Sequence, residues 1–141
     1  MAWRELTEAD LAATLSQREV DAYRQSSPAS GEDPVAGLLA RTAEMALGYC
    51  RANRALRVPA TGRAVPGSLV SACCDWAAYD VLKRQPVPVG EDRRRARDQA
   101  LELFKAVAAG TVTPEPPEDG AAAAAAGSPL AAPPYPPRLL D

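Results

Sequence analysis

Residues 69–82 read LVSACCDWAAYDVL, and this stretch decides the fold. Apolar side chains occur on every side of a helix drawn through it, with no continuous polar stripe, which is typical of a helix buried on most sides. We therefore expect residues 69–82 to form the central helix of the domain or to contribute to an interface between subunits. The candidates for subunit packing are Leu69, Val70, Cys73, Trp76, Ala77 and Tyr79.

Capping signals divide the chain before this stretch into helices. Residues 7–10 (TEAD) and 16–19 (SQRE) both carry the capping-box pattern, which predicts short helices over about 8–15 and 17–25. Asp33 followed by Pro34 is a strong helix start, and it predicts a long helix that ends near residue 53.

The segment between the long helix and the central one cannot be helical throughout, because residues 54–66 contain two prolines and a glycine. Three apolar residues in it leave open an extended loop or a short β-hairpin. A last helix is predicted from Glu91, where acidic residues complement the helix dipole, to Gly110 at the C-terminal cap position. The fold class is all-α, a small bundle of four to five helices.

The composition changes sharply after residue 110. The last 31 residues hold 8 prolines and 8 alanines, and no stretch of them can bury a core of its own. We therefore expect two units, a helical domain over 1–110 and an extended Pro/Ala-rich arm over 111–141. The end of the arm looks like a short docking peptide. Its residues are Pro133, Pro134, Tyr135, Pro136, Pro137, Arg138, Leu139 and Leu140.

Histidine is absent from the 141 residues, which excludes Ser-His-Asp and Cys-His nucleophile systems and His-ligated zinc. The three cysteines, Cys50, Cys73 and Cys74, have no metal-ligand spacing, and core packing is the better interpretation of them. Acidic pairs near helix starts are explained by capping. We predict no catalytic residue, cofactor or metal site, and therefore no enzyme. The chain also lacks an apolar run long enough to cross a membrane, so no membrane partner is expected.

The net charge of −2 excludes a strongly basic or acidic specialist. Basic residues nevertheless gather locally, and the interpretation of ordinary solvated helix faces stands beside contact with a phosphate backbone or an acidic protein surface. The run of interest is Arg51, Arg54, Arg57 and Arg63.

Residues 7–25 allow a second interpretation as a helix-turn-helix that binds DNA. Its second helix carries Arg18 and Arg24, but also Glu19 and Asp21, which is poor electrostatics for a major groove. A small DNA-binding regulator is therefore the alternative function. A third option is an adaptor that binds a host protein through its Pro-rich end.

The order of these features resembles the head–tail connector (adaptor, or head-completion) proteins of Mu-like tailed phages and prophages. The resemblance spans nearly all of residues 1–110 and rests on order and spacing. Its positions are LTEADL at 6–11, ALGY at 46–49, RVP at 57–59, VP at 65–66, the D-x-A-x-Y-x-x-L helix within 72–82, and the charged helix over 94–110.

The resemblance implies a structural protein of the phage neck. Such a subunit would join neighbouring copies in a ring, usually of twelve, that binds the portal protein, extends the DNA channel and receives a stopper or tail-completion protein. Packaged DNA would pass through without sequence-specific contact. Residues 133–140 would dock on the portal, and the four arginines at 51, 54, 57 and 63 would face the portal or the channel. The protein would be assembled in the host bacterial cytoplasm and reside in the virion.

Overall fold

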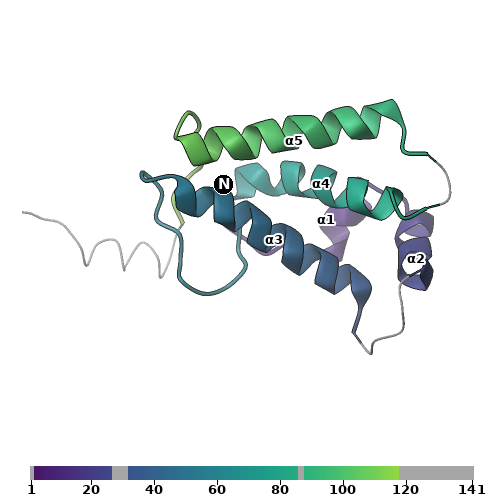
Figure 1. Ribbon diagram of the computed structural model, residues 1–141. Coiled ribbons are helices and arrows are strands. Elements are labelled where there is room, and N and C mark those ends of the chain that lie inside the picture. The colour runs from purple at the N-terminus through teal and green to yellow at the C-terminus, as the bar shows by residue number, and fades with distance from the viewer. Residues whose placement is uncertain (1, 27–31, 86–87, 118–141) are drawn as a thin grey trace, which may run out of the picture.

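The computed structural model describes residues 2–26, 32–85 and 88–117. Within them the chain is all-α, and the five α-helices confirm the predicted bundle (Figure 1). A single 3₁₀ turn, η1, precedes the fourth helix. The elements in order are α1 (Glu8–Ala12), α2 (Gln17–Ser26), α3 (Pro34–Ala52), η1 (Gly67–Leu69), α4 (Val70–Leu82) and α5 (Glu91–Ala109).

The predicted capping signals are confirmed. Thr7 and Asp10 form a reciprocal capping box at α1. The amide of Glu19 donates to Ser16 Oγ at 3.2 Å, and Glu19 Oε1 accepts from the amide of Ser16 at 2.9 Å. At α3, Asp33 Oδ1 accepts from the amide of Val35 at 3.1 Å. Each cap satisfies backbone donors that a helix start leaves without intrahelical partners, so these bounds follow from local chemistry.

Helix α4 is the central helix of the fold, the first of the two roles that its sequence allows. It lies between α5 and α3, and α1 and α2 pack against it as well (Figure 1). The positions Ala77 and Ala78 are fully buried, and their small side chains let neighbouring helices approach closely. The buried residues of α4 are Val70, Ala72, Cys73, Cys74, Ala77, Ala78 and Val81.

Aromatic rings join the three long helices. Phe104 of α5 is fully buried, and its ring stacks on Tyr49 of α3 with centroids 5.7 Å apart. Trp76 of α4 meets Phe104 edge to face at 6.4 Å. Both arrangements are favourable for aromatic pairs. Phe104 is therefore a point at which side chains of α3, α4 and α5 meet.

The segment 54–66 forms no hairpin, so of the two predicted possibilities the extended loop is the one found. Its end pairs instead with the start of the chain. The amide of Arg4 donates to the carbonyl of Val65 at 3.0 Å, and the amide of Val65 donates to the carbonyl of Arg4 at 2.9 Å. This isolated antiparallel bridge holds the N-terminal segment across the start of α4. In the described part of the chain, no helix has the length and apolar character needed to cross a bilayer.

Candidate assembly surface

Residues 111–117, which follow the cap residue Gly110 at the end of α5 and which we call the strap, turn back onto the helical body. Gly110 has a φ of 84°, a left-handed conformation that glycine adopts without strain. The amides of Thr111 and Val112 donate to the carbonyl of Ala106 at 3.0 and 3.2 Å. This cap reverses the chain at the end of α5 and directs the strap toward the end of α3.

Side chains of the body bind the strap at two points. Asn53 Nδ2 donates to the carbonyl of Val112 and to Thr113 Oγ1, both at 3.3 Å. Trp3 Nε1 donates to the carbonyl of Glu115 at 2.8 Å. The predicted arm thus begins with residues that pack against the body, which the sequence interpretation did not anticipate. Two of the strap's prolines are buried: Pro114 and Pro117.

The Glu115 side chain caps η1, the turn that leads into α4, although the two lie 47 residues apart in the sequence. Its carboxylate accepts from the amide of Ser68 at 3.1 Å and from Ser68 Oγ at 2.5 Å. Pro66, which precedes η1, provides no side-chain cap of its own. Burial opposes ionisation of Glu115, but the hydrogen bonds from Ser68 and from the amide of Glu115 itself, with the charge of the N-terminus, together hold the pKa of the carboxyl below its ordinary value. The strap therefore contributes to the start of η1 and α4.

We expect this contact to make stability depend on pH. Because the pKa of Glu115 is lower in the folded state, its contribution is present above the unfolded pKa and is lost as the pH falls through the folded pKa. Glu115→Gln should lower the free energy of unfolding by about 0.5–1 kcal/mol at pH 7. The difference from wild type should shrink below pH 4, as measured by urea denaturation across the acidic range. An equal loss at pH 7 and pH 3 would contradict the role of the charge.

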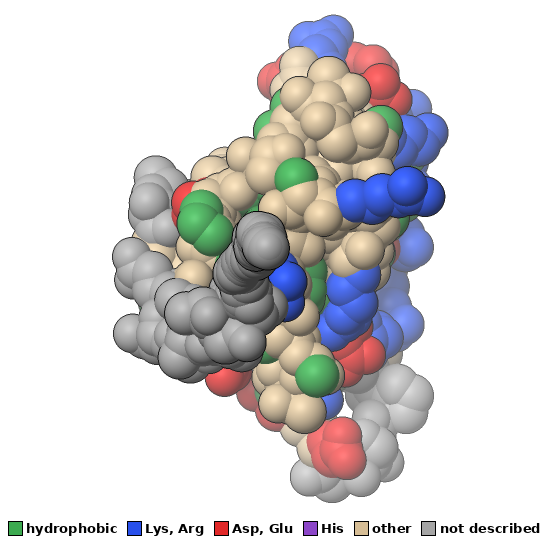
Figure 2. Space-filling model, turned by 90° about the vertical axis from the view of Figure 1, so that its left-hand side faces the viewer, with side chains coloured by type: hydrophobic (Ala, Val, Ile, Leu, Met, Phe, Trp, Pro, Cys, Tyr) green, Lys and Arg blue, Asp and Glu red, His purple; other side chains and the backbone are tan. Residues whose placement is uncertain are grey.

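Three of the four predicted basic residues, Arg51, Arg54 and Arg57, lie at or just after the end of α3, and Arg63 lies beside Glu44 near the middle of that helix. All four arginines are exposed. Arg63 forms an ion pair with Glu44 at 3.2 Å, whereas Arg51, Arg54 and Arg57 form no ion pair with any described residue. Figure 2 views the end of the molecule where α3 and α5 finish, and Lys and Arg side chains gather along one edge of it. Three arginines near α3's end are thus available to a partner.

The six predicted subunit-packing residues have different environments. Leu69, Val70, Cys73 and Ala77 are buried by the chain's own helices. Trp76 and Tyr79 are half-buried. The chain itself thus supplies the burial that the apolar helix needs at four positions. Subunit packing stays a prediction, and these two aromatic residues are the ones in the set that reach the surface.

An arginine covers both of these aromatic side chains. The guanidinium carbon of Arg97 lies 4.6 Å from the centroid of the Trp76 ring and 5.3 Å from that of Tyr79. Such cation–π stacking stabilises a partly exposed aromatic pair. Arg97 of α5 thus packs against its own chain, as does Arg93, whose guanidinium donates to the carbonyl of Thr14 at 2.8 Å.

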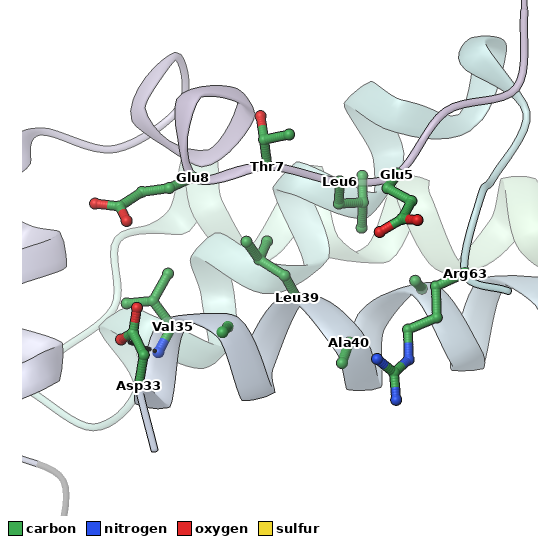
Figure 3. A pocket seen from close by; sticks show the side chains of 11 residues that line it. Glu5, Leu6, Thr7, Glu8, Asp33, Val35, Leu39, Ala40 and Arg63 are labelled. Atoms are coloured by element: carbon green, nitrogen blue, oxygen red, sulfur yellow. Dashed lines mark hydrogen bonds between the residues drawn. The ribbon is translucent and has the colours of Figure 1, made fainter. Parts of the chain in front are cut away.

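A cleft of about 310 Å³ lies between residues 5–8 and α3. Leu6 faces Leu39 and Ala40 across its middle, while Glu5 and Arg63 stand at one end and Glu8 and Asp33 at the other (Figure 3). The remaining lining residues are Thr7, Val35, Ala36 and Ala43. The cleft is therefore apolar along its floor and charged at its ends.

The acidic end of the cleft is built around one cation. Arg24 donates to both carboxylate oxygens of Glu8 and to both of Asp33, and Asp21 lies 3.9 Å from its guanidinium. These hydrogen bonds, opposed by burial, keep the pKa of Glu8 and of Asp33 low, so both carboxyls are ionised at neutral pH. The guanidinium of Arg24 is thereby occupied by hydrogen bonds within the protein. In the helix-turn-helix interpretation this leaves Arg18 as the exposed cation of α2, and no observation favours that alternative.

The three cysteine thiols are free and buried, which confirms their interpretation as core residues. Burial raises the pKa of Cys73 to about 12 and those of Cys50 and Cys74 to about 11, so none is a reactive thiolate at neutral pH. Among the described residues, no group of three or more Cys, Asp or Glu could hold a metal ion. The predicted docking residues 133–140 lie outside the described residues.

A family model named for bacteriophage Mu Gp36 matches residues 6–132 of the chain. The chain belongs to the bacteriophage Mu Gp36 family. It is thus a Mu-like phage protein, with a role in phage structure or morphogenesis. The match includes all five helices, the strap and much of the predicted arm, so the Gp36 family pattern continues past the helical body. No curated protein and no solved structure matches this Gp36-family chain.

The strap and its contacts were the part of this surface that the sequence reasoning missed. One signal was present, because Thr111, Val112 and Thr113 form a β-branched run directly before a proline. Such a run favours an extended segment that packs on a neighbour. Its docking place depends on Trp3 and Asn53, which lie more than fifty residues away along the chain, so no local pattern could have revealed it.

Proposed function

We propose that this Gp36-family protein is a connector of the phage neck, a subunit of an adaptor ring that joins the portal to the tail or stopper and extends the DNA channel. Its location is the virion, and its partners are the portal, neighbouring copies, a stopper or tail-completion protein, and passing DNA. Family membership supports the structural role in a phage, and the layout of the body supports the connecting one.

The observation that carries the proposal is the clamped strap. A rigid body with a reaching segment suits a protein that joins two larger assemblies, because a preformed surface changes little on binding while a segment beyond it can order on a partner. Trp3, Asn53 and Ser68 hold residues 111–117 on the body, so the chain beyond Pro117 starts from a defined point. Arg51, Arg54 and Arg57 are exposed on the same body, and Asn53, which lies among them in sequence, binds the strap at Val112. An acidic surface on the partner could therefore bind the exposed arginines while the chain beyond the strap docks beside them.

Deletion of residues 128–141 should leave a folded body that no longer joins the portal. Weak docking by one arm becomes strong when many copies in a ring bind together, so loss of the arm should reduce ring binding by about 100-fold or more. The measurement is co-sedimentation of the purified protein with portal rings. Circular dichroism and a thermal melt of the same sample check the fold.

A second variant separates the arm from the basic residues. The triple substitution Arg51→Ala, Arg54→Ala and Arg57→Ala should weaken portal binding and reduce its dependence on salt, because exposed charges act over about 10 Å at 0.1 M salt. The matched control is Arg18→Ala with Arg94→Ala and Arg95→Ala, three exposed arginines elsewhere on the body. If the truncated protein and the triple variant both assembled onto portal rings like wild type, the connector proposal would fail.

A gel-shift titration distinguishes the connector from the regulator. A regulator that uses residues 7–25 should select one DNA sequence, with an affinity that falls steeply with salt. A connector should show no sequence preference.

A further inference from the structure

The cleft between residues 5–8 and α3 has the chemistry of a peptide site. It is open, and its middle offers apolar contact from Leu6 on one wall and from Ala40 on the other, both half-buried, while Leu39 beside them is 8% exposed (Figure 3). Its volume of about 310 Å³ suits a few side chains rather than a folded partner. Small residues of α3 form this hollow, because a larger side chain at Ala36 or Ala40 would fill it.

The charge at one end of the cleft is not balanced within the body. Glu8, Asp21 and Asp33 surround Arg24, so three carboxylates share one guanidinium and a formal charge of −2 remains. Asp33 Oδ1 already accepts from Arg24 and from the amide of Val35, whereas Asp33 Oδ2 accepts from Arg24 and keeps further lone-pair capacity. A second cation that arrived from the cleft would therefore find acceptors that are already ionised and oriented.

The chain itself carries a segment of matching chemistry. In residues 111–141 the sole basic residue is Arg138, and Leu139 and Leu140 follow it directly. Two leucines beside one arginine complement an apolar floor that ends in an acidic cluster. We propose that the cleft between residues 5–8 and α3 binds the Arg138–Leu140 segment of the same chain.

The strap brings this segment within reach of the cleft. Glu115 is bound to Trp3, and Trp3 is three residues before Leu6, a span of at most about 11 Å of extended chain. From Pro117 to Arg138 there are 21 residues, which can extend to roughly 70 Å. A tether of this length keeps the segment at millimolar effective concentration near its own cleft, so even a weak site would be occupied. The same leucines would then be released from the cleft when the portal binds them.

Trypsin offers a direct test on the full-length protein without a portal. After residue 117, the sole site for trypsin is the bond after Arg138. Proteolysis tracks the population of the open form, so we expect cleavage there to be about 10-fold slower than in a synthetic peptide of residues 128–141. Mass spectrometry follows the loss of the last three residues. Cleavage of wild type at the rate of the peptide would overturn the proposal.

Two variants and one control show whether slow cleavage after Arg138 is caused by docking in the cleft or by some other property of the full-length protein. Ala40→Leu fills the cleft, and Leu140→Asp removes an apolar group from the segment. In each variant, cleavage after Arg138 should be as fast as in a synthetic peptide that has that variant's sequence over residues 128–141. Ala52→Leu, the same substitution at an exposed position of α3 outside the cleft, should leave protection unchanged. Protection that persists in Ala40→Leu would overturn the site. Protection that vanishes on dilution would place the segment on a second copy, and would overturn docking within one chain.

This test is independent of the connector proposal, because it contains no portal. Loss of portal binding on deletion of 128–141, together with unprotected Arg138, would support the connector and reject the cleft. Normal portal binding after deletion of 128–141, together with protection of Arg138 in the full-length protein, would support docking in the cleft and reject a role of the arm in the neck.

Discussion

Phe104→Ala should lower the free energy of unfolding by about 3–5 kcal/mol, the largest stability effect that we expect from any substitution discussed for this protein. The Phe104 ring is fully buried and contacts Tyr49 of α3 and Trp76 of α4, so its removal leaves a cavity where three helices meet. Both aromatic pairs are lost with it. Urea denaturation followed by circular dichroism measures the change.

Two further substitutions control this prediction. Phe104→Leu keeps most of the volume and should cost about half as much. Val112→Ala removes a side chain that is 39% exposed and should change the free energy by less than about 0.5 kcal/mol. If Phe104→Ala cost no more than Val112→Ala, α3, α4 and α5 could not be packed around this ring as the structure has them.

Asn53→Ala should cost about 1–3 kcal/mol and should also release the strap. Asn53 is 2% exposed, and its side chain bonds in two directions. Oδ1 accepts from the amide of Ala55 at 2.8 Å and shapes the turn after α3, while Nδ2 donates to Val112 and Thr113. The substitution therefore removes the side-chain bond that shapes the turn and the bonds that hold the strap, whereas the backbone bond from Asn53 to the carbonyl of Cys50 at the end of α3 remains. Hydrogen exchange should show faster exchange in residues 111–117 than in wild type.

Asn53→Asp separates the two functions of this side chain. The carboxylate keeps an acceptor for the amide of Ala55 but cannot donate to the strap. We expect the turn after α3 to remain and the exchange of residues 111–117 to rise, with a smaller loss of stability than in Asn53→Ala. Unchanged exchange in the strap would show that Trp3 and Glu115 hold it without Asn53.

Individual residues show how far sequence reasoning reached. Helix starts at Glu8 and Pro34 and the cap at Gly110 were predictable, because capping depends on side chains within a few residues of the helix end. The length of α1 was not, since the predicted helix over about 8–15 ends at Ala12 and continues as a turn. That end is decided by packing of Leu15 into the core with α2, α3 and α4.

The candidate surface was predictable only in its local parts. The exposure of Arg51, Arg54 and Arg57 follows from their charge, and the structure agrees. The pairing of Arg63 with Glu44, nineteen residues earlier, could not be inferred from spacing, and neither could the cleft on α3. Both depend on the path of a loop that has no regular structure of its own.

The sequence by itself determined the all-α class, the central place of α4 and the family to which the chain belongs. Hydrophobic pattern and capping are local properties, and a helix satisfies its backbone within a few residues. Tertiary structure alone decided that Val65 pairs with Arg4, that Glu115 caps η1, and that Trp3 and Asn53 hold the strap. Those contacts join segments up to 112 residues apart, and their partners are selected by which polar groups the packed helices bring together.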